Sequence, residues 1–219
     1  MKALLFSGGI DSTYEALTLK GKLHLVTFHN GYGQFFINRS YDRFRELKSS
    51  NLTYEVLSVK PIFKKILLDT LDEDMHYGGF VWCLSCKLAM HTRMILFCKE
   101  KGIKTVHDGS SADTSEMVEQ SQFAKDMIRE LYNLYSIEFM ASSYSVPREK
   151  KIAFLKRKGI STGIPLFGRN MGIQPKCIPG ELYYSPYILC GKKPHHDQKD
   201  VADFFDKKIP LIKEMIKID

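Results

Sequence analysis

The sequence predicts an α/β protein built on a doubly wound parallel sheet. Short apolar segments typical of buried strands alternate with longer segments of helical spacing, and this alternation indicates parallel strands joined by right-handed crossovers. At the first strand-to-helix junction the chain reads SGGIDS, from Ser7 to Ser12. Such a glycine turn is typical of the ligand-binding edge of this kind of sheet, so we expect the functional site at the carboxyl ends of the strands.

The expected elements follow one another in regular order up to residue 158. The predicted strands are short apolar runs at Ala3–Phe6, Leu23–Phe28, Tyr54–Val59 and Lys104–His107. Two of the predicted helices are given by their starts, at Thr13 and Pro61. The other four are predicted to span Phe35–Lys48, Leu84–Lys101, Met117–Tyr135 and Pro147–Lys158. Gly102 is expected to end the helix before it, because glycine adopts the left-handed conformation of a helix C-terminus at little cost. Residues Asp72–Trp82 are expected to form a loop.

The sequence pattern changes near residue 163. Residues 1–163 carry the alternating pattern and are predicted to form the α/β domain. Residues 164–219 begin with closely spaced glycines and prolines, which indicates an irregular segment, and end in a predicted helix at Gln198–Ile218. Because this segment carries two of the five cysteines, we expect it to fold back and complete the site.

Composition limits the classes of protein that need to be considered. The 219 residues carry a net charge of +7, which suits a polyanionic partner such as tRNA. The basic residues that cluster are Arg148, Lys150, Lys151, Lys156, Arg157, Lys158, Lys192 and Lys193. No stretch approaches the roughly 20 apolar residues of a membrane span, and the first strand leaves no room for a signal peptide, so we expect a cytoplasmic protein without membrane contact.

The SGGIDS turn has the chemistry of a phosphate site. A glycine turn that leads into a helix presents unpaired backbone N–H groups at the positive end of the helix dipole. Gly8 and Gly9 let the backbone approach a phosphate closely, Ser7 and Ser12 add hydroxyl donors, and Asp11 can hold a phosphate-bound Mg²⁺. The turn has neither the lysine of the common P-loop nor the third glycine of the dinucleotide fingerprint.

SGGIDS resembles the PP-loop of the N-type ATP pyrophosphatases, whose signature is SGGxDS near the N-terminus. The resemblance implies an adenine nucleotide α-hydrolase-like fold, an ATP-binding domain over residues 1–163, and cleavage of ATP to AMP and pyrophosphate with transfer of AMP to a substrate oxygen. It also implies that Phe28 contacts adenine. In this family a further turn closes the nucleotide site, and residues 108–113 occupy its place here. Only Gly109 and Asp113 match the residues of the family's turn.

The cysteines form a second candidate site. Cys83 and Cys86 form a CxxC pair at the expected start of a helix, where two thiols can converge on one metal and the helix dipole is expected to lower their pKa. Cys177 and Cys190 lie in the irregular segment, from which a loop can reach the same place. In a reducing compartment such cysteines are better suited to metal binding or catalysis than to disulfides, whereas Cys98 is expected in the core.

Residues 83–113 resemble the matching stretch of PP-loop tRNA thiolases of the 2-thiocytidine type. This resemblance implies an ATP-dependent sulfurtransferase with a 4Fe–4S cluster on Cys83, Cys86 and Cys177, a tRNA acceptor, and sulfur supplied as sulfide or by a donor protein. The sequence leaves the oligomeric state open, with a homodimer as one option. Several alternatives remain open from the residues, among them a non-catalytic nucleotide-binding module that senses ATP or redox state. Cys190 can be a fourth ligand, the metal can be Zn²⁺, or the chain can be a ligase for a small molecule that resembles the 7-cyano-7-deazaguanine synthases. Without a cluster, Cys83 or Cys86 can carry a persulfide as the nucleophile.

Overall fold

The computed structural model describes residues 1–166, 169–191, 194 and 196–218, and its centre is a parallel sheet of five strands. The strands lie in the order β4-β2-β1-β5-β6, with Leu4 of β1 level with Leu25 of β2 on one side and His107 of β5 on the other. The strand bounds are β1 Lys2–Leu5, β2 Leu23–His29, β4 Leu52–Ser58, β5 Thr105–Asp108 and β6 Glu138–Met140. The chain crosses to one side of β1 and later to the other, so β1 and β5 enclose the switch point at which doubly wound sheets bind ligands.

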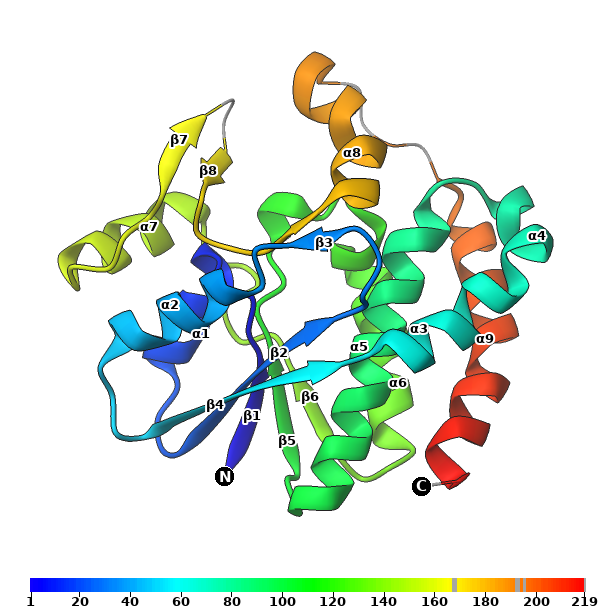
Figure 1. Ribbon diagram of the computed structural model, residues 1–219, viewed down its shortest axis with the longest axis horizontal. Coiled ribbons are helices and arrows are strands. Elements are labelled where there is room, and N and C mark those ends of the chain that lie inside the picture. The colour runs from blue at the N-terminus through cyan, green and yellow to red at the C-terminus, as the bar shows by residue number, and fades with distance from the viewer. Residues whose placement is uncertain (167–168, 192–193, 195, 219) are drawn as a thin grey trace.

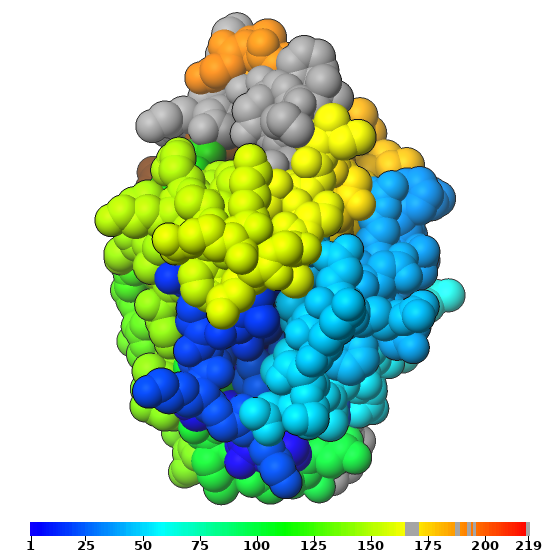
Figure 2. Space-filling model, turned by 90° about the vertical axis from the view of Figure 1, so that its left-hand side faces the viewer, coloured from blue at the N-terminus to red at the C-terminus, as the bar shows by residue number. Residues whose placement is uncertain are grey.

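Helices cover both faces of the sheet (Figure 1). One face carries α1 Ile10–Thr18, α2 Asn38–Leu47 and α7 Arg148–Arg157, and Figure 2 looks onto it. The other face carries α3 Lys60–Ile66, α5 Phe80–Lys101, α6 Gln122–Asn133 and α9 Gln198–Ile218. Alternate side chains of β1 enter the two cores, with Ala3 and Leu5 on the α5 side and Leu4 on the α1 side. This period-two burial accounts for the short apolar run in the sequence.

The C-terminal segment lies across the carboxyl edge of the sheet before α9 returns to the α5 face (Figure 1). Its smaller elements are the hairpin β7 Ile164–Leu166 and β8 Arg169–Met171, the strand β9 Lys176–Cys177, and the helix α8 Ile178–Cys190. Strand β9 pairs antiparallel with β3 Gln34–Phe35, which follows β2, and this pairing holds the segment over the edge of the sheet.

The fold confirms the doubly wound sheet and the terminal helix, and it corrects several boundaries. The expected loop at Asp72–Trp82 contains the short helix α4 Leu71–Asp74 and the first turn of α5. Strand β6 and helix α8 were not predicted, the first because it has only three residues and the second because Pro179 and Pro186 suggested irregular chain. Within the described residues one helix, α5, is long and apolar enough to span a membrane, but 78% of its most apolar stretch is buried, as in a core helix.

Candidate functional site

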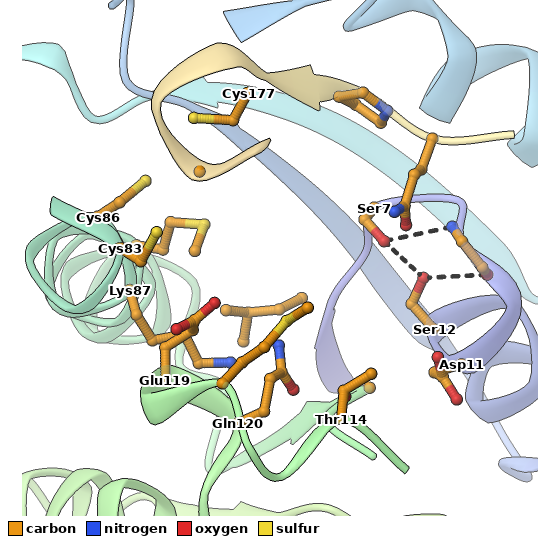
Figure 3. A pocket seen from close by; sticks show the side chains of 18 of the residues that line it. Ser7, Asp11, Ser12, Cys83, Cys86, Lys87, Thr114, Glu119, Gln120 and Cys177 are labelled. Carbon is orange, nitrogen blue, oxygen red and sulfur yellow. Dashed lines mark hydrogen bonds between the residues drawn. The ribbon is translucent and has the colours of Figure 1, made fainter. Parts of the chain in front are cut away.

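A cavity of about 840 Å³ opens at the carboxyl edge of the sheet. One wall is the SGGIDS turn, which we call the nucleotide wall, and it continues into Gly109 after β5. The opposite wall is formed by the start of α5 and by β9, and we call it the cysteine wall because it carries Cys83, Cys86 and Cys177. Figure 3 shows the two walls facing each other across the cavity. The two candidate sites of the sequence are therefore parts of one site.

The SGGIDS turn is held ready for an anion. The Ser7 hydroxyl accepts a hydrogen bond from the Gly9 N–H at 3.2 Å and lies 3.2 Å from the Ser12 hydroxyl (Figure 3). Gly8 has a φ of +73°, which favours glycine, and a Cβ there would lie 3.0 Å from the Cβ of Arg43. No side chain caps the first turn of α1 within the described residues, and this turn, from Gly9 to Ser12, lines the cavity.

Arg43 supports the turn from behind. Its side chain is buried, donates from Nε to the Gly8 carbonyl at 3.1 Å and from Nη2 to the Ser161 carbonyl at 2.6 Å, and forms an ion pair with Glu46. This role could not be predicted from the sequence, because Arg43 is one of several cations on a polar helix. A buried guanidinium beneath the turn adds positive potential where a phosphate would bind.

Asp11 is paired with two cations from α7. Lys151 donates from Nζ to Asp11 Oδ1 at 2.7 Å and to the Ser111 hydroxyl at 3.1 Å, and an Nη atom of Arg148 lies 3.3 Å from Asp11 Oδ2. Lys151 is fully buried, so it cannot belong to a surface for RNA as the basic cluster suggested. The turn lacks a lysine of its own, and α7 supplies the missing positive charge from about 140 residues away in the sequence.

The other nucleotide residues predicted from the sequence also line the cavity. Asp113 accepts a hydrogen bond from the Arg148 backbone N–H at 2.7 Å, which brings it close to Asp11. Gly109 has a packing role, because a Cβ there would lie 2.7 Å from the backbone nitrogen of Ser12. Phe28, the last residue but one of β2, lies on the cavity wall and is 6% exposed.

Three of the four candidate metal ligands lie together. Cys83 and Cys86 are in the first two turns of α5, and β9 brings Cys177 opposite them (Figure 3). A Cβ on Gly180 would lie 3.5 Å from Cys83 Sγ and 3.9 Å from Cys177 Sγ, so the thiols enclose a small open space. Cys190 is exposed and is not among the lining residues.

The remaining cysteine and the second basic cluster lie away from these three thiols or cannot be placed. Cys98 is buried in the core, as expected. Lys192 and Lys193 of the predicted basic cluster lie outside the described residues.

The pKa prediction for the CxxC thiols was wrong in its direction. Burial raises the pKa of Cys86 to about 12, and it raises the pKa of Cys83 and Cys177 as well, with the Glu119 carboxylate adding to the effect on each. Helix α5 begins at Phe80, so Cys86 lies in its second turn, where the dipole is weak. These thiols are neutral until a metal displaces their protons.

A buried ion pair lies beneath the cysteine wall. Lys87 follows the CxxC motif directly and donates to Asp108 Oδ2 at 2.6 Å, and the same oxygen accepts from the Ser110 hydroxyl at 2.8 Å. His91 Nε2 is 3.8 Å from Asp108, and burial lowers the pKa of His91 to about 3, which keeps it neutral. The sequence signal was a lysine one residue after a metal-binding motif on an otherwise apolar helix face, and we missed it.

The fold is similar to that of two proteins of known structure. No known family model matches the sequence, and no curated protein has a significantly similar sequence. A 4-thiouridine synthetase, whose structure was solved in complex with RNA and ATP, is similar with a TM-score of 0.52 and 15% identity over 98% of this chain. The U34-tRNA thiolase NcsA from Methanococcus maripaludis, solved with its 4Fe–4S cluster, is similar with a TM-score of 0.51 and 12% identity over 99% of this chain.

The match spans 53% of the synthetase chain and 71% of the thiolase chain, so this protein corresponds to about half of the first. At such low identity the likeness concerns the fold. It confirms the adenine nucleotide α-hydrolase-like fold that the SGGIDS motif implied.

Proposed function

We propose that this protein is an ATP-dependent sulfurtransferase. In this proposal it adenylates a carbonyl oxygen of a tRNA base, releases pyrophosphate, and then replaces that oxygen with sulfur. The observation that carries the proposal is that the SGGIDS turn and three free cysteines line one cavity of about 840 Å³. A site with room for a nucleotide beside thiols suits a reaction that activates with ATP and substitutes with sulfur. Fold relatives that thiolate tRNA are in keeping with it.

The nucleotide wall would bind the triphosphate. The N-terminal turn of α1 and the hydroxyls of Ser7 and Ser12 offer hydrogen-bond donors to phosphate oxygens. Asp11 and Asp113 are the residues that would hold Mg²⁺, and the ion would neutralise phosphate charge. Lys151 and Arg148, which contact Asp11, would add positive charge beside the leaving pyrophosphate.

The cysteine wall fits a sulfur-ligated cluster. Thiolates are the ligands that iron–sulfur clusters use, and Gly180 leaves open the space between Cys83 and Cys177. Among the described residues, no group of three or more His, Cys, Asp or Glu side chains is placed to hold a metal ion. When bound by Cys83, Cys86 and Cys177, a cluster would supply an iron with an open position for sulfide.

The acceptor surface would lie beside the nucleotide wall. Arg148 and Lys151 turn toward Asp11, whereas Lys150, Lys156 and Arg157 of α7 and Lys158 directly after it are exposed. Helix α7 lies on the face seen in Figure 2, where it borders α1. Basic groups of this kind bind a nucleic-acid backbone with a strong dependence on salt.

The test is anaerobic purification followed by assay with ATP, unmodified tRNA and sodium sulfide. We expect a brown protein with iron and acid-labile sulfide, formation of AMP and pyrophosphate that depends on RNA, and RNA affinity that falls steeply between low and moderate salt. Formation of ADP and phosphate would contradict the proposal. Colourless, zinc-loaded protein that forms AMP with a small acid instead of RNA would favour the small-molecule ligase.

A further inference from the structure

One side chain of the C-terminal segment lies directly on the SGGIDS turn. A Cβ on Gly9 would lie 2.2 Å from Gln174 Oε1 and 3.3 Å from Gln174 Cδ, so the Gln174 amide packs against the Cα of Gly9. Gly9 has a φ of −69° and a ψ of 175°, a backbone conformation that any residue can adopt. A side chain at Gly9 would therefore displace Gln174 without straining the turn itself.

The Gln174 amide has hydrogen-bonding capacity to spare. Gln174 is half-buried and lines the cavity, and within the described part of the chain no hydrogen bond holds its amide to the protein. Its Nε2 carries two N–H donors. A phosphate oxygen bound at the uncapped N-terminus of α1 would lie beside Gly9, and therefore beside this amide.

The segment that carries Gln174 connects the two walls of the cavity. Ile173, directly before it, is 7% exposed and packs in the core on the α1 side of the sheet. Lys176 begins β9, and Cys177 at the end of β9 lines the cavity across from the SGGIDS turn (Figure 3). Residues 173–177, which we call the strap, therefore run directly from the nucleotide wall to the cysteine wall.

We propose that Gln174 is a nucleotide-binding residue supplied by the C-terminal segment, and that its hydrogen bond to the triphosphate fixes the strap and with it the position of Cys177. This inference deepens the proposed function and rests on its nucleotide-binding step. The charged oxygen of a phosphate is a stronger acceptor than water or a neutral carbonyl, so the bond forms only when nucleotide is present. Nucleotide binding then orders Cys177 without any contact between ATP and the thiol.

Two variants separate a hydrogen-bond donor from a side chain that only packs on the turn. Gln174→Leu removes both N–H donors but keeps a side chain of similar volume against Gly9. Gln174→Glu keeps the length of the side chain and places a carboxylate beside the phosphates. Gln122→Leu is the matched control, because Gln122 is exposed in the first turn of α6 and is not among the residues that line the cavity.

The first measurement is calorimetric titration of the metal-free protein with the α,β-methylene analogue of ATP in the presence of Mg²⁺. This analogue cannot release pyrophosphate, so binding is measured without turnover. We expect Gln174→Leu to weaken binding about tenfold, because a hydrogen bond to a charged group is lost. Gln174→Glu should weaken binding further, because its carboxylate repels the phosphates, and Gln122→Leu should match the wild type.

The second measurement is the rate at which each cysteine of the metal-free protein is alkylated at one fixed pH, resolved by mass spectrometry. The analogue is either absent or present at a concentration that saturates each protein. In the wild type it should slow the alkylation of Cys177 by about fivefold or more, because the strap opens less often. In Gln174→Leu this protection should be lost. Cys190 is exposed and serves as the internal reference that the analogue leaves unchanged.

Equal or tighter binding by Gln174→Leu would overturn the inference, and tighter binding would mark Gln174 as a side chain that the phosphates displace. Equal protection of Cys177 in the wild type and in Gln174→Leu would mean that the nucleotide shields the thiol directly, and the link through the strap would be wrong. In both cases nucleotide binding by the wild type still supports the proposed function. A wild type that does not bind the analogue would contradict the proposed function at its first step.

Discussion

The two walls of the cavity are built in different ways. The nucleotide wall is a local structure, because six consecutive residues from Ser7 to Ser12 form the turn and the start of α1. The cysteine wall is assembled from distant parts, since Cys86 and Cys177 are about 90 residues apart and meet only when β9 pairs with β3. The geometry of the nucleotide wall therefore depends on local backbone conformation, whereas that of the cysteine wall depends on the packing of the C-terminal segment.

The walls also differ in charge. Arg43, Lys151 and Arg148 make the nucleotide wall electropositive from behind and from the side. The thiols of the cysteine wall are buried, and Glu119 raises their pKa further. The first wall is therefore ready for an anion in the free protein, whereas the second becomes anionic only when a metal takes the place of its protons.

The largest effect is expected at Asp11. Asp11→Ala should abolish AMP formation, because the carboxylate proposed to hold Mg²⁺ is gone. It should also lower the free energy of unfolding by about 1–3 kcal/mol, since Lys151 stays buried with the Ser111 hydroxyl as a partner but loses its carboxylate. Urea unfolding and AMP release measure the two effects.

Asp11→Asn is the control for that variant, with equal loss of activity and a smaller loss of stability. Turnover that is unchanged in Asp11→Ala would remove Asp11 from the site.

Replacement of the cysteines tests the second wall. Alanine at Cys83, Cys86 or Cys177 should remove the brown colour and stop sulfur transfer, because each thiol faces the same cavity. Adenylation by the nucleotide wall should persist in part. Cys98→Ala and Cys190→Ala are matched controls that should retain the colour, the first being a core residue and the second exposed. Absorbance and iron content measure the result, and loss of the cluster in Cys190→Ala would make that residue a fourth ligand.

The pH dependence of alkylation separates burial from the helix dipole as the main influence on Cys86. With a pKa of about 12, its thiolate fraction should rise about tenfold per pH unit between pH 7 and 10, and so should its rate of alkylation in the metal-free protein. A thiol activated by the helix N-terminus would instead reach a plateau below pH 8. Mass spectrometry that resolves each cysteine distinguishes the two curves.

Much of the nucleotide wall could be predicted from the sequence because its chemistry is local. Ser7 to Ser12 come just after β1, whose apolar run is plain in the sequence, and Gly109 directly follows β5, the strand that neighbours β1. Arg43 and Lys151 could not be predicted, since each is one basic residue among several on its helix, and only the tertiary fold turns it inward.

The cysteine wall was predicted in part. The CxxC spacing identified Cys83 and Cys86, and Cys177 was named through the family resemblance. Their pKa was predicted in the wrong direction because burial depends on long-range packing that a sequence pattern does not report. The contact between Gln174 and Gly9 was not predicted, because the two residues lie far apart in the sequence and no motif joins them.

The smallest effect is expected from a pair of glycines. Gly109→Ala should lower the free energy of unfolding by about 1–3 kcal/mol, because its Cβ would lie 2.7 Å from the Ser12 nitrogen and backbone must shift to admit it. Gly102→Ala, at the end of α5 with a φ of +65° and no neighbour within 4 Å of its Cβ, should cost about 1–2 kcal/mol from backbone strain alone. The two variants thus have comparable stability, but only Gly109→Ala displaces the phosphate turn. Titration with ATP should therefore show weaker binding for Gly109→Ala and wild-type binding for Gly102→Ala, and equal affinities would mean that the turn does not depend on this close approach.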